Sequence, residues 1–359
     1  MDIRMDRRGF IGVAGAATAA AALGGPARAA APLKVGFVFT GPIGDGGYTF
    51  QHNLGRLAVD KELGAAVKTS FVENVAEGPD AERVIRQLAQ AGNDLIFTTS
   101  FGFMDSTVKV AKQFPKTHFE HATGYKRAPN LATYNARFYQ GRQVQGQIAA
   151  MLSKKGEAGY IASFPIPEVV MGINAFTLAA RKVNPKFVTK VIWVNTWYDP
   201  AKEADSAKAL MDQGCDIMCQ HTDSVAPLQA AQTRGVVGFG QSSDMSKAAP
   251  KACLTSTVDS WGPYYVRRVK EQIAGKWASA DTWGGMAAGM VTMGAYGPGM
   301  TPEAKAAADK VIAQIKAHKL PAMIGPVKDQ KGVVKIAAGS NAADKDLLGM
   351  NWYVEGVQG

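Results

Sequence analysis

The sequence predicts an α/β protein of two doubly wound lobes with parallel-sheet cores, joined by a three-segment hinge. Short continuous apolar runs alternate with amphipathic stretches, a pattern typical of parallel strands covered by helices on both faces. This strand–helix series occurs twice, with about five strands each time. A chain of 359 residues is long enough for two domains of ordinary size.

The expected elements follow in chain order. The first series of strands is expected at 34–39, 68–74, 94–99, 117–121 and 131–136. The second series is expected at 158–163, 190–195, 215–220, 236–241 and 253–258. Helices are expected at 80–92, 199–214 and 301–319. Asp199 and Thr301 each precede a proline, which is a favoured way to begin a helix.

The two lobes are expected to share the chain discontinuously. We assign residues 32–138 and 259–288 to the N-terminal lobe, and residues 139–258 and 289–359 to the C-terminal lobe. Hinge segments are expected near 137–140, 257–261 and 287–292, where the chain passes between the lobes.

Residues 1–29 have the pattern of an export signal. Arg7 and Arg8 precede an apolar run from Phe10 to Leu23, and Ala27-Arg28-Ala29 fits a small-x-small cleavage site. The paired arginines followed by Phe10-Ile11 favour twin-arginine export, with an ordinary secretory signal as the alternative. No cysteine lies near the cleavage site. We therefore expect a soluble periplasmic protein without a lipid anchor.

Composition and motifs argue against several function classes. The net charge of +10 is spread along the chain without a dense Lys/Arg block, so we expect no nucleic-acid partner. Cys215 and Cys219 lie four residues apart on an expected strand, about 13 Å, beyond disulfide reach. That spacing also disfavours a metal site. The five histidines form no nucleophile–base arrangement. We expect no enzymatic activity, metal or cofactor.

Ligand contacts in doubly wound sheets come from loops at the carboxyl ends of strands. Seven stretches meet this condition: TGPIGDGGYTF (40–50), SFGFMD (100–105), SFPIPE (163–168), NTWYDP (195–200), HTDSVAP (221–227), SSDM (242–245) and DSWGP (259–263). They carry aromatic rings and carboxylates, which together suit a flat heteroaromatic ligand with N–H groups. The candidate ligand-binding residues are Tyr48, Phe101, Phe103, Asn135, Trp197, Asp223, Asp244 and Asp259.

The glycine-rich loop at 41–47 is similar to a phosphate-binding loop, but its spacing fits neither phosphate motif and no lysine follows it. The ring of Tyr48 favours a stacking role for this loop instead. Asp45 is expected to cap the helix that follows.

The loops together resemble the basic membrane protein (Bmp) family of ABC-transporter substrate-binding proteins, which includes the purine nucleoside receptor. The resemblance rests on DGGYTF (45–50), AQAGNDLIFTTSFGFMDSTVKVAKQFP (89–115), NTWYDPAKE (195–203), SSDM (242–245), PVKDQKG (326–332) and MNWYVEGVQG (350–359). It implies a type I periplasmic binding fold and a membrane permease as partner. It places stacking rings at Tyr48 and Trp197, a loop aromatic at Phe101, and a sugar-facing carboxylate at Asp244.

Two departures from the family pattern concern the ligand. Gly41 and Asp259 stand where nucleoside binders carry Asp and Lys, respectively. The expected ligand is therefore a purine nucleobase such as adenine, bound by a monomer between closing lobes, with Asp259 or Asp223 accepting its N–H groups. The alternatives are a nucleoside-binding or sugar-binding protein of the same fold, or a ligand sensor for a membrane receptor. Asn135 keeps the sugar alternative open.

Overall fold

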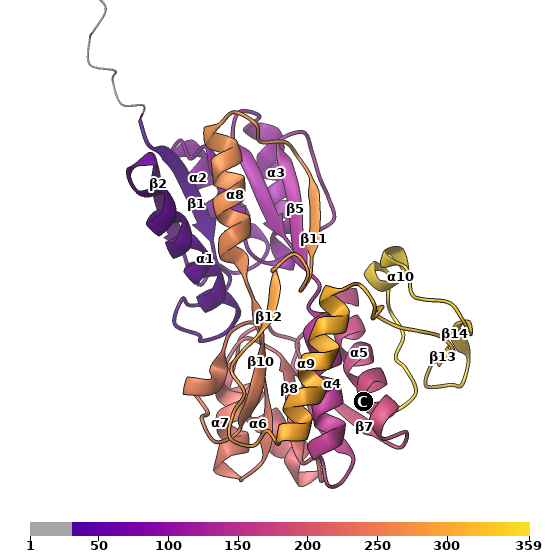
Figure 1. The fold of residues 1–359 in the computed structure, drawn as a ribbon. Helices are drawn as coiled ribbons and strands as arrows, with labels where there is room; N and C mark the ends of the chain where they lie inside the picture. The colour runs from indigo at the N-terminus through magenta and orange to yellow at the C-terminus, as the bar shows by residue number, and fades with distance from the viewer. Residues whose placement is uncertain (1–30) are drawn as a thin grey trace, which may run out of the picture. The chain divides into compact units, whose positions relative to one another are not determined.

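The computed structural model describes residues 31–359, and the predicted signal segment lies outside the described residues. Two parallel-sheet cores follow one another along the chain, as the sequence predicts (Figure 1). All ten expected strands are present, with ends shifted by at most two residues. We call the part built around the first sheet the first lobe and the part built around the second sheet the second lobe.

The first sheet has the order β11-β5-β4-β3-β1-β2, and all neighbouring strands are parallel. Its strands are β1 (Leu33–Val38), β2 (Val67–Val72), β3 (Leu95–Thr98), β4 (His118–Ala122), β5 (Leu131–Ala136) and β11 (Asp281–Gly284). In register, Phe37 of β1 lies beside Phe97 of β3, and the two rings stack at 4.8 Å.

Helices cover both faces of the first sheet. They are α1 (Tyr48–Leu63), α2 (Pro79–Gln90), α3 (Met104–Gln113) and α8 (Trp261–Ile273). Successive strand residues point to opposite faces, so Phe37 packs in the core shared with α1 and α8, whereas its neighbour Val38 packs against α2 and α3. This alternation explains why the strands are apolar throughout.

The second sheet repeats the winding in the order β12-β10-β9-β8-β6-β7-β15, with only the β10–β12 pair antiparallel. Its strands are β6 (Glu157–Ala162), β7 (Val188–Trp193), β8 (Ile217–His221), β9 (Val237–Gly240), β10 (Cys253–Asp259), β12 (Val291–Met293) and β15 (Val357–Gln358). The helices are α4 (Tyr139–Leu152), α5 (Pro167–Val183), α6 (Pro200–Asp212), α7 (Ala226–Thr233) and α9 (Pro302–Lys316).

The strand order in each lobe creates a point where the winding reverses. β1 lies between β2 and β3, and β6 lies between β7 and β8. Loops leaving neighbouring strands at such a point diverge to opposite faces, which opens a crevice at their carboxyl ends. Both lobes therefore offer a crevice of the same kind.

The chain passes between the two sheets three times: after β5, after β10 and after β11. The three predicted hinge segments lie at or beside these passages, and their bending stays a prediction.

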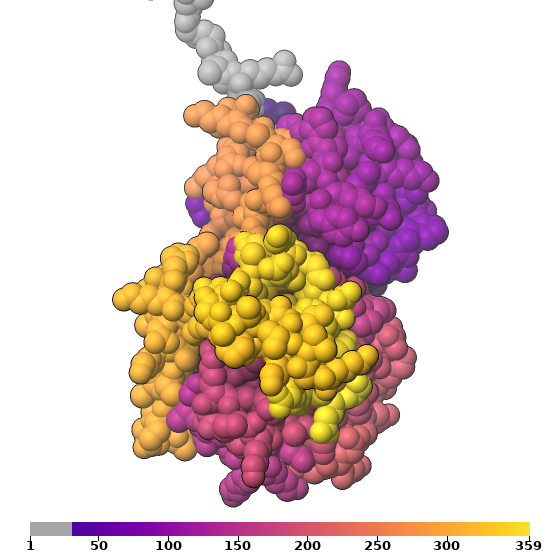
Figure 2. All heavy atoms as spheres, turned by 90° about the vertical axis from the view of Figure 1, so that its right-hand side faces the viewer, coloured from indigo at the N-terminus to yellow at the C-terminus, as the bar shows by residue number. Residues whose placement is uncertain are grey.

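Beyond α9, the C-terminal segment contains a hairpin of β13 (Val327–Lys328) and β14 (Val334–Ile336), followed by α10 (Asp344–Leu348). This segment is drawn yellow and forms much of the face seen in Figure 2. Arg137, which follows β5, pairs with Asp344 of α10.

Local sequence signals behave as predicted at the helix ends. Asp199 accepts a hydrogen bond from the backbone N–H of Lys202 at 3.1 Å, and Thr301 accepts one from Ala304 at 3.2 Å. Cys215, Cys219 and Cys253 are buried free thiols. Within residues 31–359, no helix is long and apolar enough to cross a membrane, and no cluster of His, Cys, Asp or Glu has the arrangement of a metal site.

Candidate functional site

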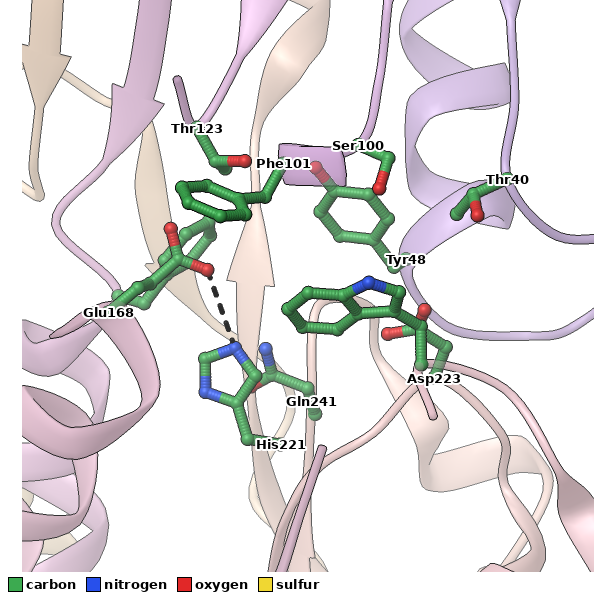
Figure 3. A pocket seen from close by; sticks show the side chains of 11 residues that line it. Thr40, Tyr48, Ser100, Phe101, Thr123, Glu168, His221, Asp223 and Gln241 are labelled. Atoms are coloured by element: carbon green, nitrogen blue, oxygen red, sulfur yellow. Dashed lines mark ion pairs between the residues drawn. The ribbon is translucent and has the colours of Figure 1, made fainter. Parts of the chain in front are cut away.

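A small cavity lies where the carboxyl-end loops of the two sheets meet. Ligands of doubly wound proteins bind at this end of the strands. Its lining combines aromatic rings with polar groups from both lobes: Thr40, Tyr48, Ser100, Phe101, Thr123, Phe138, Glu168, Trp197, His221, Asp223 and Gln241. Figure 3 shows Tyr48, Ser100, Phe101 and Thr123 on one side of the cavity, with His221 and Gln241 opposite.

The glycine-rich loop forms a helix entrance in which a carboxylate takes the place of a phosphate. Asp45 accepts hydrogen bonds from the backbone N–H groups of Gly47, Thr49 and Phe50 at 2.8, 3.0 and 2.9 Å. These are the amides that a phosphate-binding loop would offer to its ligand. Burial raises the pKa of Asp45 to about 6, and the backbone hydrogen bonds oppose that rise. The predicted capping role of Asp45 is thus observed.

Tyr48, the first residue of α1, is supported by a column of rings. Its ring meets His52, one helical turn later, edge-on at 4.3 Å, and His52 stacks on Trp261 at 4.7 Å. Trp261 is fully buried at the start of α8. Because the i and i+4 side chains share one helix face, the sequence of α1 itself places His52 behind Tyr48 and holds that ring against the cavity.

Two further rings line the cavity from different lobes. Phe101 lies in the short 3₁₀ helix Phe101–Phe103 after β3, and Trp197 lies in the loop after β7. Phe164 packs against Trp197 at 5.1 Å with an interplanar angle of 60°. The indole N–H of Trp197 donates to Glu77 of the first lobe at 3.0 Å. Trp197 is therefore held from both lobes.

A polar cluster of Glu168, His221 and Asn135 lies at one end of the cavity. One carboxylate oxygen of Glu168 accepts from Asn135 Nδ2 at 3.1 Å, and the other lies 3.6 Å from His221 Nε2 (Figure 3). Burial lowers the pKa of His221, so the imidazole is neutral at pH 7. With its proton on Nε2 toward Glu168, His221 keeps Nδ1 as a buried acceptor that has no partner within residues 31–359.

Asp223 brings a buried carboxyl group to the same cavity. Burial, followed by the nearby Asp45 carboxylate, raises the pKa of Asp223 well above its usual value. Its backbone N–H donates to the carbonyl of Trp197 at 2.9 Å. This bond ties the loops after β7 and β8 together, so that Asp223 and Trp197 approach the cavity as one unit.

Four of the predicted ligand-binding residues line the cavity, namely Tyr48, Phe101, Trp197 and Asp223. Asn135 lies just behind the lining and touches it through Glu168. Asp259 is fully buried at the end of β10 and does not line the cavity, although both of its carboxylate oxygens lack a hydrogen-bond partner within residues 31–359.

Phe103 and Asp244 lie elsewhere. Phe103 is fully buried in the core beneath α2 and α3, because the 3₁₀ turn after β3 directs it inward and leaves Phe101 at the surface of the cavity. Asp244 is exposed and caps the short helix Met245–Lys247 through the N–H of Ser246 at 3.0 Å. It also accepts from Ala295 at 3.3 Å, so its carboxylate is engaged away from the cavity.

Gly41, which stands where nucleoside binders carry Asp, does not line the cavity. A Cβ at this position would lie 3.1 Å from Thr49 Oγ1 and 3.7 Å from Asp45 Oδ2, beneath the loop. The neighbouring residue, Thr40, is the one that lines the cavity. The absence of a carboxylate at position 41 therefore does not by itself change the chemistry of the cavity wall.

Sequence reasoning missed Glu168, His221 and Gln241. Glu168 is the second residue of α5 and His221 the last residue of β8, both within stretches that the strand-end rule selects, and Gln241 directly follows β9. The position after a strand was the available signal. It identified the loops, but not which side chain of each loop turns toward the cavity.

Comparison with known proteins identifies the family. Residues 33–330 match the family model Bmp, described as ABC transporter substrate-binding protein PnrA-like. The chain belongs to the Bmp family. Its members are substrate-binding proteins of ABC transporters, not enzymes. Such proteins bind small-molecule ligands and work with an ABC permease, typically outside the cytoplasm.

Two relatives match nearly the whole chain. One is "Purine-binding protein BAB2_0673" of Brucella abortus, with 57% identity over 93% of this chain and 95% of the relative. The other is "Putative ABC transporter glucose-binding protein TsgA13" of Haloferax volcanii, with 36% identity over 94% of this chain and 83% of the relative. These two relatives are named for two different ligand classes.

Solved structures support the fold. A solute-binding protein of an ABC transporter system from Aeropyrum pernix K1 superposes with a TM-score of 0.69 at 18% identity, covering 84% of this chain and 94% of that one. A solute-binding protein from Conexibacter woesei gives a TM-score of 0.65 at 19% identity, covering 80% and 97%. The predicted periplasmic binding fold of this Bmp protein is therefore confirmed.

Proposed function

We propose that this protein is the periplasmic receptor of an ABC importer for a purine nucleobase such as adenine. The observation that carries the proposal is the combination of three rings, Tyr48, Phe101 and Trp197, with buried hydrogen-bonding groups around one small cavity. Aromatic rings offer flat surfaces on which a planar base stacks. The polar groups between them match the N–H groups and ring nitrogens of a base.

The charge of the cavity supports an uncharged ligand. Among residues 31–359, the acidic side chains Glu168 and Asp223 line it, and no lysine or arginine does. A phosphate group would find no cation there, and the backbone amides at the start of α1 already bind Asp45. Nucleotides are therefore disfavoured, because a phosphate would meet acidic side chains and would find the amides at the start of α1 already bonded.

The relative that is 57% identical and named a purine-binding protein supports the same ligand class. At that identity over nearly the whole chain, we expect the residues around the cavity to serve the same type of ligand.

The export of the mature chain to the periplasm, its monomeric state and the closing of the lobes around the ligand belong to this proposal. They rest on the family, the predicted signal at residues 1–29 and the three passages between the sheets.

A sugar is the second candidate, because a relative with 36% identity is named as a putative glucose-binding protein. The cluster of Asn135, Glu168 and His221 could bind hydroxyl groups as well as ring nitrogens. A nucleoside would combine both kinds of contact. A role in ligand sensing for a membrane receptor would use the same cavity and differs only in the downstream partner.

Titration calorimetry of the purified protein tests the ligand. We expect binding heat with adenine, guanine, hypoxanthine or xanthine. The matching nucleosides should bind more weakly, and glucose should give no binding heat. Clear binding of nucleosides with no heat from any base would overturn the nucleobase assignment, and glucose binding alone would favour the second candidate.

Replacing Trp197 with Ala should weaken base binding by roughly 5- to 150-fold, the equivalent of about 1–3 kcal/mol of stacking. Trp352→Ala, in the C-terminal segment outside the cavity, is the matched control.

A further inference from the structure

Arg142 is a buried cation directly behind the cavity. It lies on α4 with no exposed surface. Its guanidinium donates to Gln145 Oε1 at 2.7 Å, to the carbonyl oxygen of Gln220 at 2.7 Å and to Gln241 Oε1. A weaker contact reaches Cys219 Sγ at 3.5 Å. Within residues 31–359, no carboxylate lies within ion-pair distance of Arg142, so amide and carbonyl oxygens are the oxygen acceptors of this buried charge, and its Nε has no partner there.

The chemistry of Arg142 fixes the orientation of Gln241. A guanidinium group has donors and no acceptor, so a glutamine that faces it must present its oxygen. The amide nitrogen of Gln241 is then turned the other way, and Figure 3 shows it on the cavity side of the residue. This nitrogen donates no hydrogen bond to any group among residues 31–359. Gln241 as a whole is buried and lines the cavity.

A second glutamine strengthens this arrangement. Gln145 accepts from Arg142 through Oε1 and donates through Nε2 to the carbonyl oxygen of Gly240 at 3.1 Å. Gly240 is the last residue of β9 and directly precedes Gln241. Arg142 and Gln145 therefore hold both the side chain of Gln241 and the backbone that carries it.

We infer that Arg142 is a positioning residue that fixes Gln241 as a hydrogen-bond donor to the ligand, so that the bound base must present an unprotonated ring nitrogen or a carbonyl oxygen to it. This inference rests on the proposed function and adds a specificity rule to it. A ligand without an acceptor at that point leaves a buried amide N–H unpaired, which is costly in a cavity from which water is excluded.

Base analogues that each lack one acceptor test the rule. Calorimetry with the purified protein compares adenine with 1-deaza-, 3-deaza- and 7-deazaadenine, in which a C–H replaces one ring nitrogen. Purine and hypoxanthine form a further pair, in which hypoxanthine gains the exocyclic oxygen at C6 and carries a proton on N1. We expect one acceptor deletion to weaken binding to the wild-type protein by roughly 10- to 100-fold through Gln241.

Two substitutions at Gln241 link that penalty to its side chain. In Gln241→Met the penalty for this one deletion should vanish. In Gln241→Glu, a carboxylate still pairs with Arg142 but turns an oxygen toward the ligand. Adenine binding should then fall by more than about tenfold, and the acceptor-lacking analogue should bind as well as adenine or better. Gln143→Met, which removes a buried glutamine on α4 that does not line the cavity, should leave all ratios unchanged.

Arg142→Met tests the positioning role separately, because Gln241 is retained but its amide is free to rotate. We expect the same analogue penalty to shrink even though the donor is still present. If this variant does not fold, Gln241→Glu carries the test alone. Penalties that are the same in wild type and in both Gln241 variants would overturn this inference while leaving the proposed function intact. A wild-type protein that binds no purine would overturn both.

Discussion

The indole N–H of Trp197 donates to Glu77 at 3.0 Å, and this bond joins the two lobes at the mouth of the cavity. Glu77 lies in the loop after β2 of the first lobe, whereas Trp197 follows β7 of the second. The same carboxylate oxygen accepts from Ser100, whose residue lines the cavity. The bond between Glu77 and Trp197 forms only when the two lobes are close together. It then holds the predicted stacking ring of Trp197 in place.

Removing this carboxylate should make the closed form open more readily. We expect Glu77→Ala to speed ligand release by roughly two- to tenfold, since each lost hydrogen bond contributes about 0.5–1.5 kcal/mol. Glu77→Gln retains an acceptor oxygen and should stay close to wild type. Stopped-flow measurement of tryptophan fluorescence during displacement of bound adenine gives the rates. Equal release rates for all three proteins would show that the bond has no role in closure.

Gly47 lies where the glycine-rich loop of the first lobe packs against the second lobe. A Cβ at Gly47 would lie 1.9 Å from the backbone oxygen of Asp223, a distance that no side chain tolerates. We expect Gly47→Ala to hinder closure and weaken ligand binding by roughly 5- to 150-fold, as overpacking of about 1–3 kcal/mol implies. Small-angle scattering should show that wild type compacts when ligand is added and that Gly47→Ala compacts less.

Gly44 provides the matched control for this substitution. It lies in the same loop and a Cβ there would meet nothing within 4 Å. Gly44→Ala should bind and compact like wild type. Normal compaction in Gly47→Ala, or equal losses in both variants, would contradict the predicted contact.

His121 should make stability depend on acidity. The Nε2–H of this fully buried residue donates to the carbonyl oxygen of Ser100 at 2.8 Å, and burial lowers the pKa of His121 to about 4. Because the unfolded chain has the higher pKa, near 6.5, it binds the proton first, and stability is lost as pH falls from about 6.5 to about 4. The loss attributable to His121 is on the order of 3 kcal/mol.

Urea unfolding across this pH range measures the effect. His121→Asn removes the titrating group, so the difference in unfolding free energy between wild type and variant should shrink as pH falls. Comparing the two proteins cancels the contributions of the other buried histidines and carboxyls. A difference that stays constant from pH 7 to pH 4 would refute the assignment.

Asp259 should act in the opposite direction. Burial, with a smaller contribution from Glu168, raises its pKa well above the usual value, while Ser242 and Arg142 oppose the rise. The folded protein then binds the proton more tightly than the unfolded chain, so stability declines as pH rises from about 4 through the raised pKa. Asp259→Asn keeps the shape without the ionisation, and its stability relative to wild type should increase with pH in the same unfolding assay. A relative stability that decreases with pH would show that the carboxylate is stabilised in the fold.

Much of the architecture was predictable because it depends on local pattern. Apolar runs flanked by helical periodicity identified all ten expected strands, and residues such as Asp199 and Thr301 marked helix starts through their own backbone contacts. The sequence also led to Asp45 as a cap and to Tyr48, Phe101, Trp197 and Asp223, because residues just after a strand must emerge at the edge of the sheet.

The direction of a side chain within a loop was not predictable in this way. Phe101 and Phe103 have the same chemistry two residues apart, yet one lines the cavity and the other fills the core. Asp223 and Asp244 both follow strands, but a free backbone N–H in a short helix engages Asp244. Such outcomes depend on turn geometry and on partners that lie far away in the chain.

By itself, the sequence determined that the chain forms two doubly wound sheets. It also determined that the loops at their carboxyl ends carry aromatic rings and carboxylates. Only the tertiary structure decided that Glu168, His221 and Gln241 complete the cavity, and that Arg142 on α4 directs the amide of Gln241. The physical reason is that periodicity and capping act over a few residues. Side-chain orientation around a cavity depends instead on hydrogen bonds between residues such as Arg142 and Gln241, whose proximity arises from folding and leaves no local trace.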